Sequence, residues 1–91
     1  MSDSVTREFT INNETGLHAR PAAMFVKLAA RFTCEVWVEK DEEQVNGKSI
    51  MGLMMLAAGP GSTVTVTTEG SDAEDAIAEI AALIESGFEG A

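Results

Sequence analysis

The only histidine of the chain, His18, lies in a segment whose residue types favour phosphate chemistry. In this segment, Thr15 to Ala22, Gly16 supplies a tight turn, and Pro21 suits the first turn of a helix because its missing N–H breaks no intrahelical hydrogen bond. An unperturbed histidine titrates near pH ~6.5, so at neutral pH much of it is neutral and nucleophilic. The spacing therefore predicts a nucleophilic ring beside the start of a helix.

The same helix start would attract the group that the nucleophile receives. The helix dipole disfavours a second positive charge on the ring, and the free N–H groups of the first turn favour an arriving anion. Arg20, two residues after His18, offers a fork of donors to phosphate oxygens. A structural histidine or a helix cap is the simpler alternative. The neighbouring glycine, proline and arginine instead favour His18 as a phosphoryl acceptor and Arg20 as a phosphate clamp.

An enzyme that uses His18 as a general base is a weaker alternative. No acid adjoins the ring in the motif to orient it, and the sequence shows no second catalytic group. We expect no metal site and no cofactor.

Two motifs carry a resemblance to a known family. The segment Gly16 to Ala22 matches, without a gap, the motif Gly-[Leu/Ile]-His-Ala-Arg-Pro-Ala of the histidine-containing phosphocarrier protein (HPr) family of the bacterial phosphotransferase system, and Asn46 to Met54 matches a second family segment. The chain resembles this family over nearly its whole length. The resemblance implies that His18 accepts phosphate from phosphoenolpyruvate through Enzyme I, on Nδ1, and passes it to an enzyme IIA-type acceptor. Such a protein is a carrier and not an enzyme, because turnover needs both partners.

Ser49 has a structural role and a further role that the resemblance implies. As the residue that opens the second predicted helix, it is a natural N-cap. In many Gram-positive and some other members of the family, the matching serine is phosphorylated by a dedicated HPr kinase/phosphorylase. A phosphate there adds about −1.5 to −2 charge at a helix N-terminus, so the fold should survive while docking of an acidic partner weakens.

A second hypothesis is a regulatory phosphoprotein that controls partner proteins through its phosphorylation state rather than feeding sugar uptake. The Met-rich stretch from Gly52 to Gly61 resembles the nitrogen-type branch of the family. The sequence leaves the branch, the acceptor and the phosphorylated ring nitrogen open.

Seven elements must position these residues. Period-two and helical patterns predict strands at Val5 to Ile11, Cys34 to Glu39, Gln44 to Asn46 and Ser62 to Thr68, and helices at His18 to Arg31, Ser49 to Ala57 and Ala73 to Gly87. Ser71 and Glu74 have the spacing of a capping box before the last helix. The order βαββαβα predicts an α+β fold with the helices on one face of the sheet. The family resemblance implies an open-faced two-layer sandwich with a four-stranded antiparallel sheet, and the strand order stays open.

The composition fits a small intracellular protein. Ninety-one residues with 45% apolar content suit one domain over residues 1–91, with a frayed terminus from Gly87 to Ala91. No apolar run approaches the ~18 residues of a membrane span, no secretory signal is present, and Cys34 has no intrachain disulfide partner. We therefore expect a cytoplasmic monomer that does not insert into a membrane.

The charge distribution indicates the kind of partner. A net charge of −9 argues against nucleic acid and anionic membranes, because both need a basic surface. The segments Thr15 to Cys34 and Gln44 to Thr68 contain no acid and include both motifs. An ordinary solvated helix face is the alternative, but a basic end would steer the protein toward an acidic partner. The basic side chains of these segments are Arg20, Lys27, Arg31 and Lys48.

The second motif adds apolar residues to that end. Ile50, Leu53 and Leu56 repeat at offsets of three and predict a buried row, which leaves Met51 and Met54 for an adaptable contact patch. In the alternative interpretation, all of these side chains are buried in the core. With the family's docking region in mind, we expect partner contacts at Lys27, Lys48, Ile50, Met51 and Met54.

Overall fold

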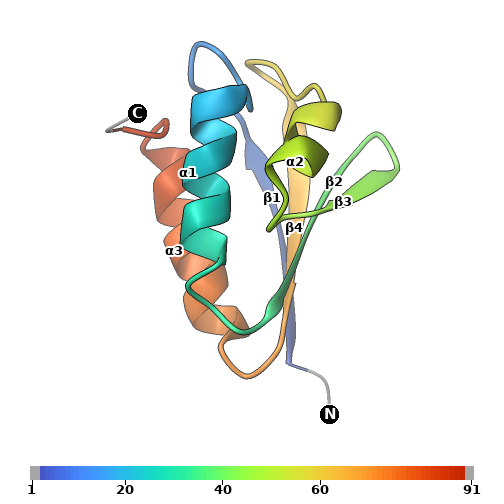
Figure 1. Cartoon of the computed structure of the whole chain (residues 1–91), viewed down its shortest axis with the longest axis vertical. Coiled ribbons are helices and arrows are strands. Elements are labelled where there is room, and N and C mark those ends of the chain that lie inside the picture. Colours follow the sequence, from blue (N-terminus) through green and yellow to red (C-terminus); the bar gives the residue numbers. More distant parts are fainter. Residues whose placement is uncertain (1–2, 90–91) are drawn as a thin grey trace.

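The computed structural model describes residues 3–89 and contains four strands and three helices (Figure 1). They follow the chain as β1 (Ser4–Thr10), α1 (Ala19–Ala29), β2 (Glu35–Lys40), β3 (Glu43–Asn46), α2 (Ile50–Met55), β4 (Thr63–Glu69) and α3 (Ala73–Glu85). This confirms the predicted order βαββαβα, with boundaries shifted by a few residues. No helix within residues 3–89 is long and apolar enough to cross a membrane.

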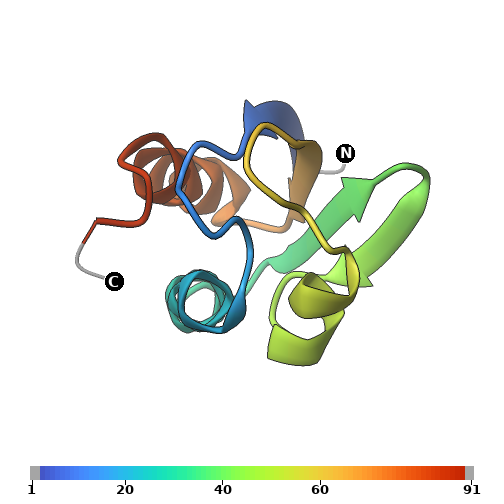
Figure 2. The ribbon, with the colours of Figure 1, turned by 90° about the horizontal axis from the view of Figure 1, so that it is seen from above.

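The four strands form one antiparallel sheet in the order β1-β4-β2-β3. All three helices lie on the same side of this sheet, as the view from above shows (Figure 2). The α+β open-faced sandwich is therefore confirmed. The last strand, β4, sits in the middle of the sheet between β1 and β2.

Alternation along the strands separates a buried face from an open one. Phe9, Val36, Val38, Val64 and Val66 point toward the helices and are buried, and removing this apolar surface from water stabilises the fold by about 25 cal/mol per Å². The open face is polar: the hydroxyl oxygens of two opposed threonines, Thr6 and Thr67, lie 3.1 Å apart across β1 and β4.

Trp37 lies on that open face of β2, between Thr67 of β4 and Asn46 of β3, and is half-buried. Its neighbours along the strand, Val36 and Val38, alternate with it and face the helices. Trp37 therefore packs on the sheet surface that no helix covers.

Arg7 is the one charged residue of β1 on the helix side of the sheet. Its guanidinium carbon lies 5.0 Å from the centre of the Phe9 ring, and its Nη2 lies 3.7 Å from Oε2 of Glu85 near the end of α3. Both partners of this ion pair are well exposed, and β1 is an edge strand of the sheet. The edge position therefore lets a charge interrupt the apolar pattern at little energetic cost.

The predicted capping box at Ser71 and Glu74 is wrong. The N-cap of α3 is Asp72, whose side chain does not cap the helix. The Asp72 carboxylate instead accepts hydrogen bonds from N–H of Thr33 (2.8 Å), N–H of Cys34 (2.9 Å) and the Thr33 hydroxyl (3.3 Å). The helix start is thereby tied to the chain entering β2.

The end of α3 and the segment after it are better ordered than the sequence indicates. Gly87, with φ +72°, follows the last turn as predicted, and its N–H donates to the carbonyl of Ile84. Phe88 does not fray: only 2% of its surface is exposed, and its N–H donates to the carbonyl of Leu83. The expected fraying of residues 90–91 lies outside the described residues.

A two-residue turn joins β2 to β3. Asp41 and Glu42 both have positive φ, at 52° and 69°, as a tight hairpin turn requires. Glu43, which precedes the expected strand Gln44 to Asn46, already pairs with Lys40 in the sheet. The sequence located this hairpin and missed the start of β3 by one residue.

Candidate functional site

His18 is the N-cap residue of α1 and is exposed to solvent. Its backbone is extended, its carbonyl oxygen accepts the first helical hydrogen bond from Ala22 (2.9 Å), and its ring makes no capping bond. The N–H groups of Ala19 and Arg20 have no acceptor within residues 3–89, and Pro21 has no N–H to satisfy. The ring therefore stands beside two free donors at the positive end of the helix dipole.

A glycine fixes the loop that presents the ring. Gly16 has φ +66°, and a Cβ at this position would collide with the backbone at Ala58 and Gly59. Next to it, the buried Leu17 donates its N–H to the carbonyl of Ala58 (2.8 Å). The loop before His18 is thus fastened to the segment that follows α2.

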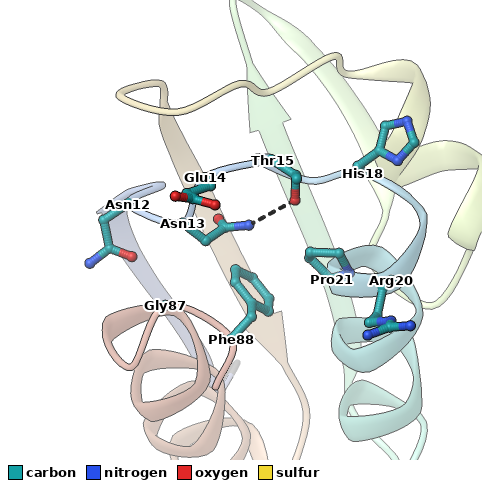
Figure 3. A pocket seen from close by; sticks show the side chains of 9 residues that line it. All are labelled: Asn12, Asn13, Glu14, Thr15, His18, Arg20, Pro21, Gly87 and Phe88. Atoms are coloured by element: carbon teal, nitrogen blue, oxygen red, sulfur yellow. Dashed lines mark hydrogen bonds between the residues drawn. The ribbon is translucent and has the colours of Figure 1, made fainter. Parts of the chain in front are cut away.

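Asn13 holds the same loop from inside. Its Nδ2 donates to the carbonyl oxygen of Gly16 (2.9 Å) and, more weakly, to the Thr15 hydroxyl (3.4 Å), a bond drawn in Figure 3. Its Oδ1 is buried and has no partner within the described residues. Our sequence interpretation missed Asn13, although an asparagine shortly before a glycine is a usual signal for such a turn.

His18 and Arg20 border one shallow cavity but point away from each other. The cavity, of about 600 Å³, is also lined by Thr15, Pro21 and Phe88. Figure 3 shows the His18 ring directed away from α1 and the Arg20 guanidinium directed along it. Arg20 is exposed and forms no ion pair with any residue in the range 3–89. Its side chain is therefore free to rotate toward an anion on the ring.

A second hollow connects His18 to α2. It is lined by His18, Thr15 and Leu17 on one side and by Met54, Ala57, Ala58 and Gly59 on the other. A partner that approaches the ring from this side would also contact α2.

The short helix α2 leaves four large apolar side chains exposed, which we name the methionine patch: Ile50 (41% exposed), Met51 (74%), Met54 (39%) and Met55 (66%). Leu53 and Leu56 are buried, as predicted, but the expected burial of Ile50 is wrong because Ile50 begins the helix, beyond the covered part of the core. The exposure of Met55 was not predicted. A helix of six residues offers one face to the core, so one more methionine had to be exposed.

Ser49 is the N-cap of α2, as predicted. Its hydroxyl oxygen accepts a hydrogen bond from N–H of Gly52 (3.0 Å), and the residue is half-buried. This arrangement satisfies one of the free donors at the helix start.

The two lysines expected to meet a partner differ in their surroundings. Lys27 is exposed in the last turn of α1. Lys48 is half-buried, and its ammonium donates a hydrogen bond of 2.7 Å to the carbonyl oxygen of Phe32. Lys48 therefore has a structural contact that the sequence did not indicate. No group of three or more His, Cys, Asp or Glu side chains among residues 3–89 is arranged to hold a metal ion.

Comparison with known proteins decides the family. A family model described as the phosphorylation site of the phosphotransferase-system HPr component matches residues 5–86. The chain belongs to the HPr family. The HPr-like protein Crh of Halalkalibacterium halodurans is 53% identical over 81 residues, which cover 89% of this chain and 96% of that protein. The phosphocarrier protein HPr of Cupriavidus necator is 49% identical over 82 residues, which cover 90% and 92%.

Solved HPr structures have the same fold. The crystal structure of HPr from Thermoanaerobacter tengcongensis matches with a TM-score of 0.90 and 50% identity over 92% of this chain and 94% of that one. Crh of Bacillus subtilis, described as a swapped dimer, matches with a TM-score of 0.74 and 46% identity over 91% and 95%. The chain is thus an HPr-family phosphocarrier protein of the bacterial phosphotransferase system. The nitrogen-type branch stays a prediction.

Proposed function

We propose that this chain carries a phosphoryl group on His18, received from phosphoenolpyruvate through an Enzyme I-type donor and passed to an enzyme IIA-type acceptor. The supporting observation is the exposed ring at the N-cap of α1, beside the N–H groups of Ala19 and Arg20, which have no acceptor within residues 3–89. A neutral ring nitrogen attacks the phosphorus atom, and a P–N bond forms as the donor's bond to phosphorus breaks. The P–N bond breaks in turn when the acceptor attacks.

The groups around His18 suit the charge that moves through this step. The helix dipole and the two free N–H groups favour the phosphoryl oxygens. Arg20 rotates from its position along α1 and adds a charged donor to the same oxygens. These groups hold the phosphate between two partners, so the chain acts as a carrier and does not turn over alone.

The methionine patch and the basic residues of α1 would receive the partner. The patch adjoins His18 through the hollow that Met54 lines, and Arg20 and Lys27 lie two helical turns apart on α1. Methionine side chains adapt to differently shaped partners, and the basic residues favour an acidic surface. We assign the docking contacts to Lys27, Ile50, Met51, Met54 and Met55, and leave Lys48 with its contact to Phe32.

Ser49 is proposed as a regulatory phosphorylation site for an HPr kinase/phosphorylase. Its hydroxyl lies at the start of α2, next to the methionine patch. A phosphate there would place about two negative charges at the docking surface while the helix N-terminus tolerates them. An acidic partner would then bind more weakly.

The first experiment is phosphorylation with phosphoenolpyruvate and a matched Enzyme I. We expect an acid-labile mass increase of one phosphate on a peptide that contains His18, absent from a His18→Ala variant whose far-ultraviolet circular dichroism is unchanged. Label that persists in the variant, or no label with several Enzyme I donors, would overturn the proposal.

The second candidate function is that of a regulatory phosphoprotein. The 53% identity to the HPr-like protein Crh supports this candidate. The two roles are distinguished by the fate of the phosphate. A carrier loses its His18 label to an enzyme IIA within the turnover time of Enzyme I. A regulator retains the label, and its phosphorylation state changes its affinity for another protein.

We also propose that the protein acts as a cytoplasmic monomer. All four strands pair within the one chain, including β1 along its whole length with β4. Light scattering should therefore give a mass near 9.6 kDa. Twice this mass would contradict the proposal and favour an exchange of segments like that described for Crh.

A further inference from the structure

The sulfur-containing residues in the described part of the chain differ sharply in their access to solvent. The chain has one cysteine and five methionines. Only 2% of Cys34 is exposed, and burial, helped by the neighbouring Asp72 carboxylate, raises the pKa of its thiol. The thiolate is the form that oxidants attack, so Cys34 is protected both by burial and by its protonation.

Among the methionines of residues 3–89, the two most exposed belong to the methionine patch. Met51 is 74% exposed and Met55 is 66% exposed, and an offset of four residues places them on the same side of α2. Met54 is less open, at 39%. Met24, on α1, is half-buried between that helix and α3. Among the described residues, an oxidant would therefore reach the docking surface first.

We propose that Met51 and Met55 form an oxidation-sensitive modification site, and that their conversion to sulfoxides by a peroxide weakens docking of the phosphoryl donor. The proposal rests on the function proposed above, because it assigns docking to this patch. In the reaction a sulfur lone pair attacks one peroxide oxygen, the O–O bond breaks and an S–O bond forms. Sulfur loses two electrons, and hydrogen peroxide is reduced to water.

The chemical change acts on the property that docking needs. A sulfoxide is polar and chiral, whereas the thioether is apolar and adaptable, so two sulfoxides would leave Ile50 and Met54 as the apolar remainder of the patch. The fold should survive, since Leu53 and Leu56 hold α2 on the core and remain apolar. Sulfoxide reductases reverse the reaction, which makes the change a switch rather than damage.

The test oxidises the whole protein with graded hydrogen peroxide and maps sulfoxides by peptide mass spectrometry. Phosphorylation of His18 by Enzyme I is then measured over a range of carrier concentrations. We expect Met51 and Met55 to oxidise before Met24. We also expect KM for the carrier to rise by about tenfold, with kcat little changed, because losing apolar burial weakens binding. Treatment with methionine sulfoxide reductases should restore KM.

Two variants separate the effect of Met51 and Met55 from that of Met24. In a Met51→Leu, Met55→Leu double variant, peroxide should leave KM at whatever value the variant has before treatment. A Met24→Leu variant should keep the full response to peroxide. The proposal falls if KM is unchanged when both sulfoxides have formed, if Met24 oxidises as fast as Met51, or if the double variant responds as strongly as the parent.

The untreated protein in the same assay tests the proposed function separately. If it accepts phosphate on His18 and oxidation has no effect on KM, only the oxidation proposal fails. If it never accepts phosphate from Enzyme I, the carrier function fails and takes this proposal with it. Circular dichroism of the oxidised protein excludes unfolding as the cause of a rise in KM.

Discussion

The ammonium of Lys48 lies 2.7 Å from the carbonyl oxygen of Phe32 and donates a hydrogen bond to it. Phe32 follows the last turn of α1, and Lys48 precedes α2. This bond joins the end of the helix that begins at His18 to the start of the helix that carries the methionine patch. A residue expected to meet a partner thus connects the two helices of the candidate site.

Replacing Lys48 with Met should destabilise the fold by about 1 to 2 kcal/mol, because a charged donor to a half-buried carbonyl is lost. Urea unfolding measures this change. Lys27→Met, at an exposed position, is the matched control and should shift the free energy of unfolding by less than about 0.5 kcal/mol. Equal effects of the two variants would show that the bond to Phe32 contributes nothing.

Asp72 makes the fold sensitive to acid. Hydrogen bonds from the backbone at Thr33, and further bonds from Thr33 and Cys34, lower the pKa of this carboxyl below 3.8. A carboxyl whose pKa is lowered in the folded state stabilises the fold at pH values above the pKa of the unfolded chain. This stabilisation is lost as the pH falls through the lowered pKa of the folded state. Unfolding is followed from about pH 5 to about pH 2, where carboxyl groups ordinarily titrate. On acidification, Asp72→Asn should lose less stability than the parent. Asp75→Asn, with the same charge change on the same helix, should behave like the parent.

Gly16→Ala should damage both fold and site. A side chain here would be strained by the positive φ and would collide with the backbone at Ala58. We expect a loss of about 2 to 4 kcal/mol in the free energy of unfolding and slower phosphorylation of His18. Gly59→Ala is the control, because nothing lies within 4 Å of the Cβ it would add. A Gly16→Ala protein as stable as Gly59→Ala would contradict the assigned role of the loop.

Arg20→Ala should slow phosphoryl transfer by about tenfold or more, because a charged donor to the phosphoryl oxygens is removed. Stability should change little, since Arg20 is exposed and has no ion pair in the described part of the chain. Rapid-quench measurement of His18 phosphorylation tests this. Arg31→Ala removes the same charge near the other end of α1, and an equal slowing by both variants would sink the clamp role.

Ser49→Asp should keep α2 intact and weaken donor docking. Aspartate caps a helix as well as serine does, while its charge lies beside the methionine patch. We expect a higher KM for the carrier in the Enzyme I assay and an unchanged melting temperature. Ser49→Asn, a neutral cap of the same shape, should retain the parent KM. If the Asn variant loses as much affinity as the Asp variant, charge is not the cause.

The sequence predicts the elements well because their signals are local. The alternation of Val36 and Val38 predicts the buried face of β2, and Gly16 and Pro21 mark the entry to α1. The strand order cannot be predicted from local signals, because a period of two assigns a face to each strand and says nothing about which strand lies beside it. Phe9 lies opposite Val64 across a long stretch of intervening chain. Only the packing of the whole core selects that partner.

The same distinction holds for the candidate site. His18 and Arg20 were recognisable because their motif is continuous in the sequence. The exposure of Ile50 and Met55 could not be predicted from the sequence, since it depends on how far the sheet and α1 extend beneath α2. Likewise, the sequence did not indicate the contacts of Asp72, because Thr33 and Cys34, whose N–H groups donate to its carboxylate, are distant in sequence.

Trp37 is an intrinsic fluorophore whose position limits the structural changes that its emission reports. It is the single tryptophan, and the chain has no tyrosine, so the tryptophan emission band arises from one ring on the open face of the sheet. His18 and the methionine patch belong to the opposite, helix-covered side. Emission from Trp37 should therefore report global unfolding faithfully and remain silent when a partner binds. A titration of docking followed by intrinsic fluorescence would look like an absence of binding, and a dye placed near α2 is needed to see the complex form.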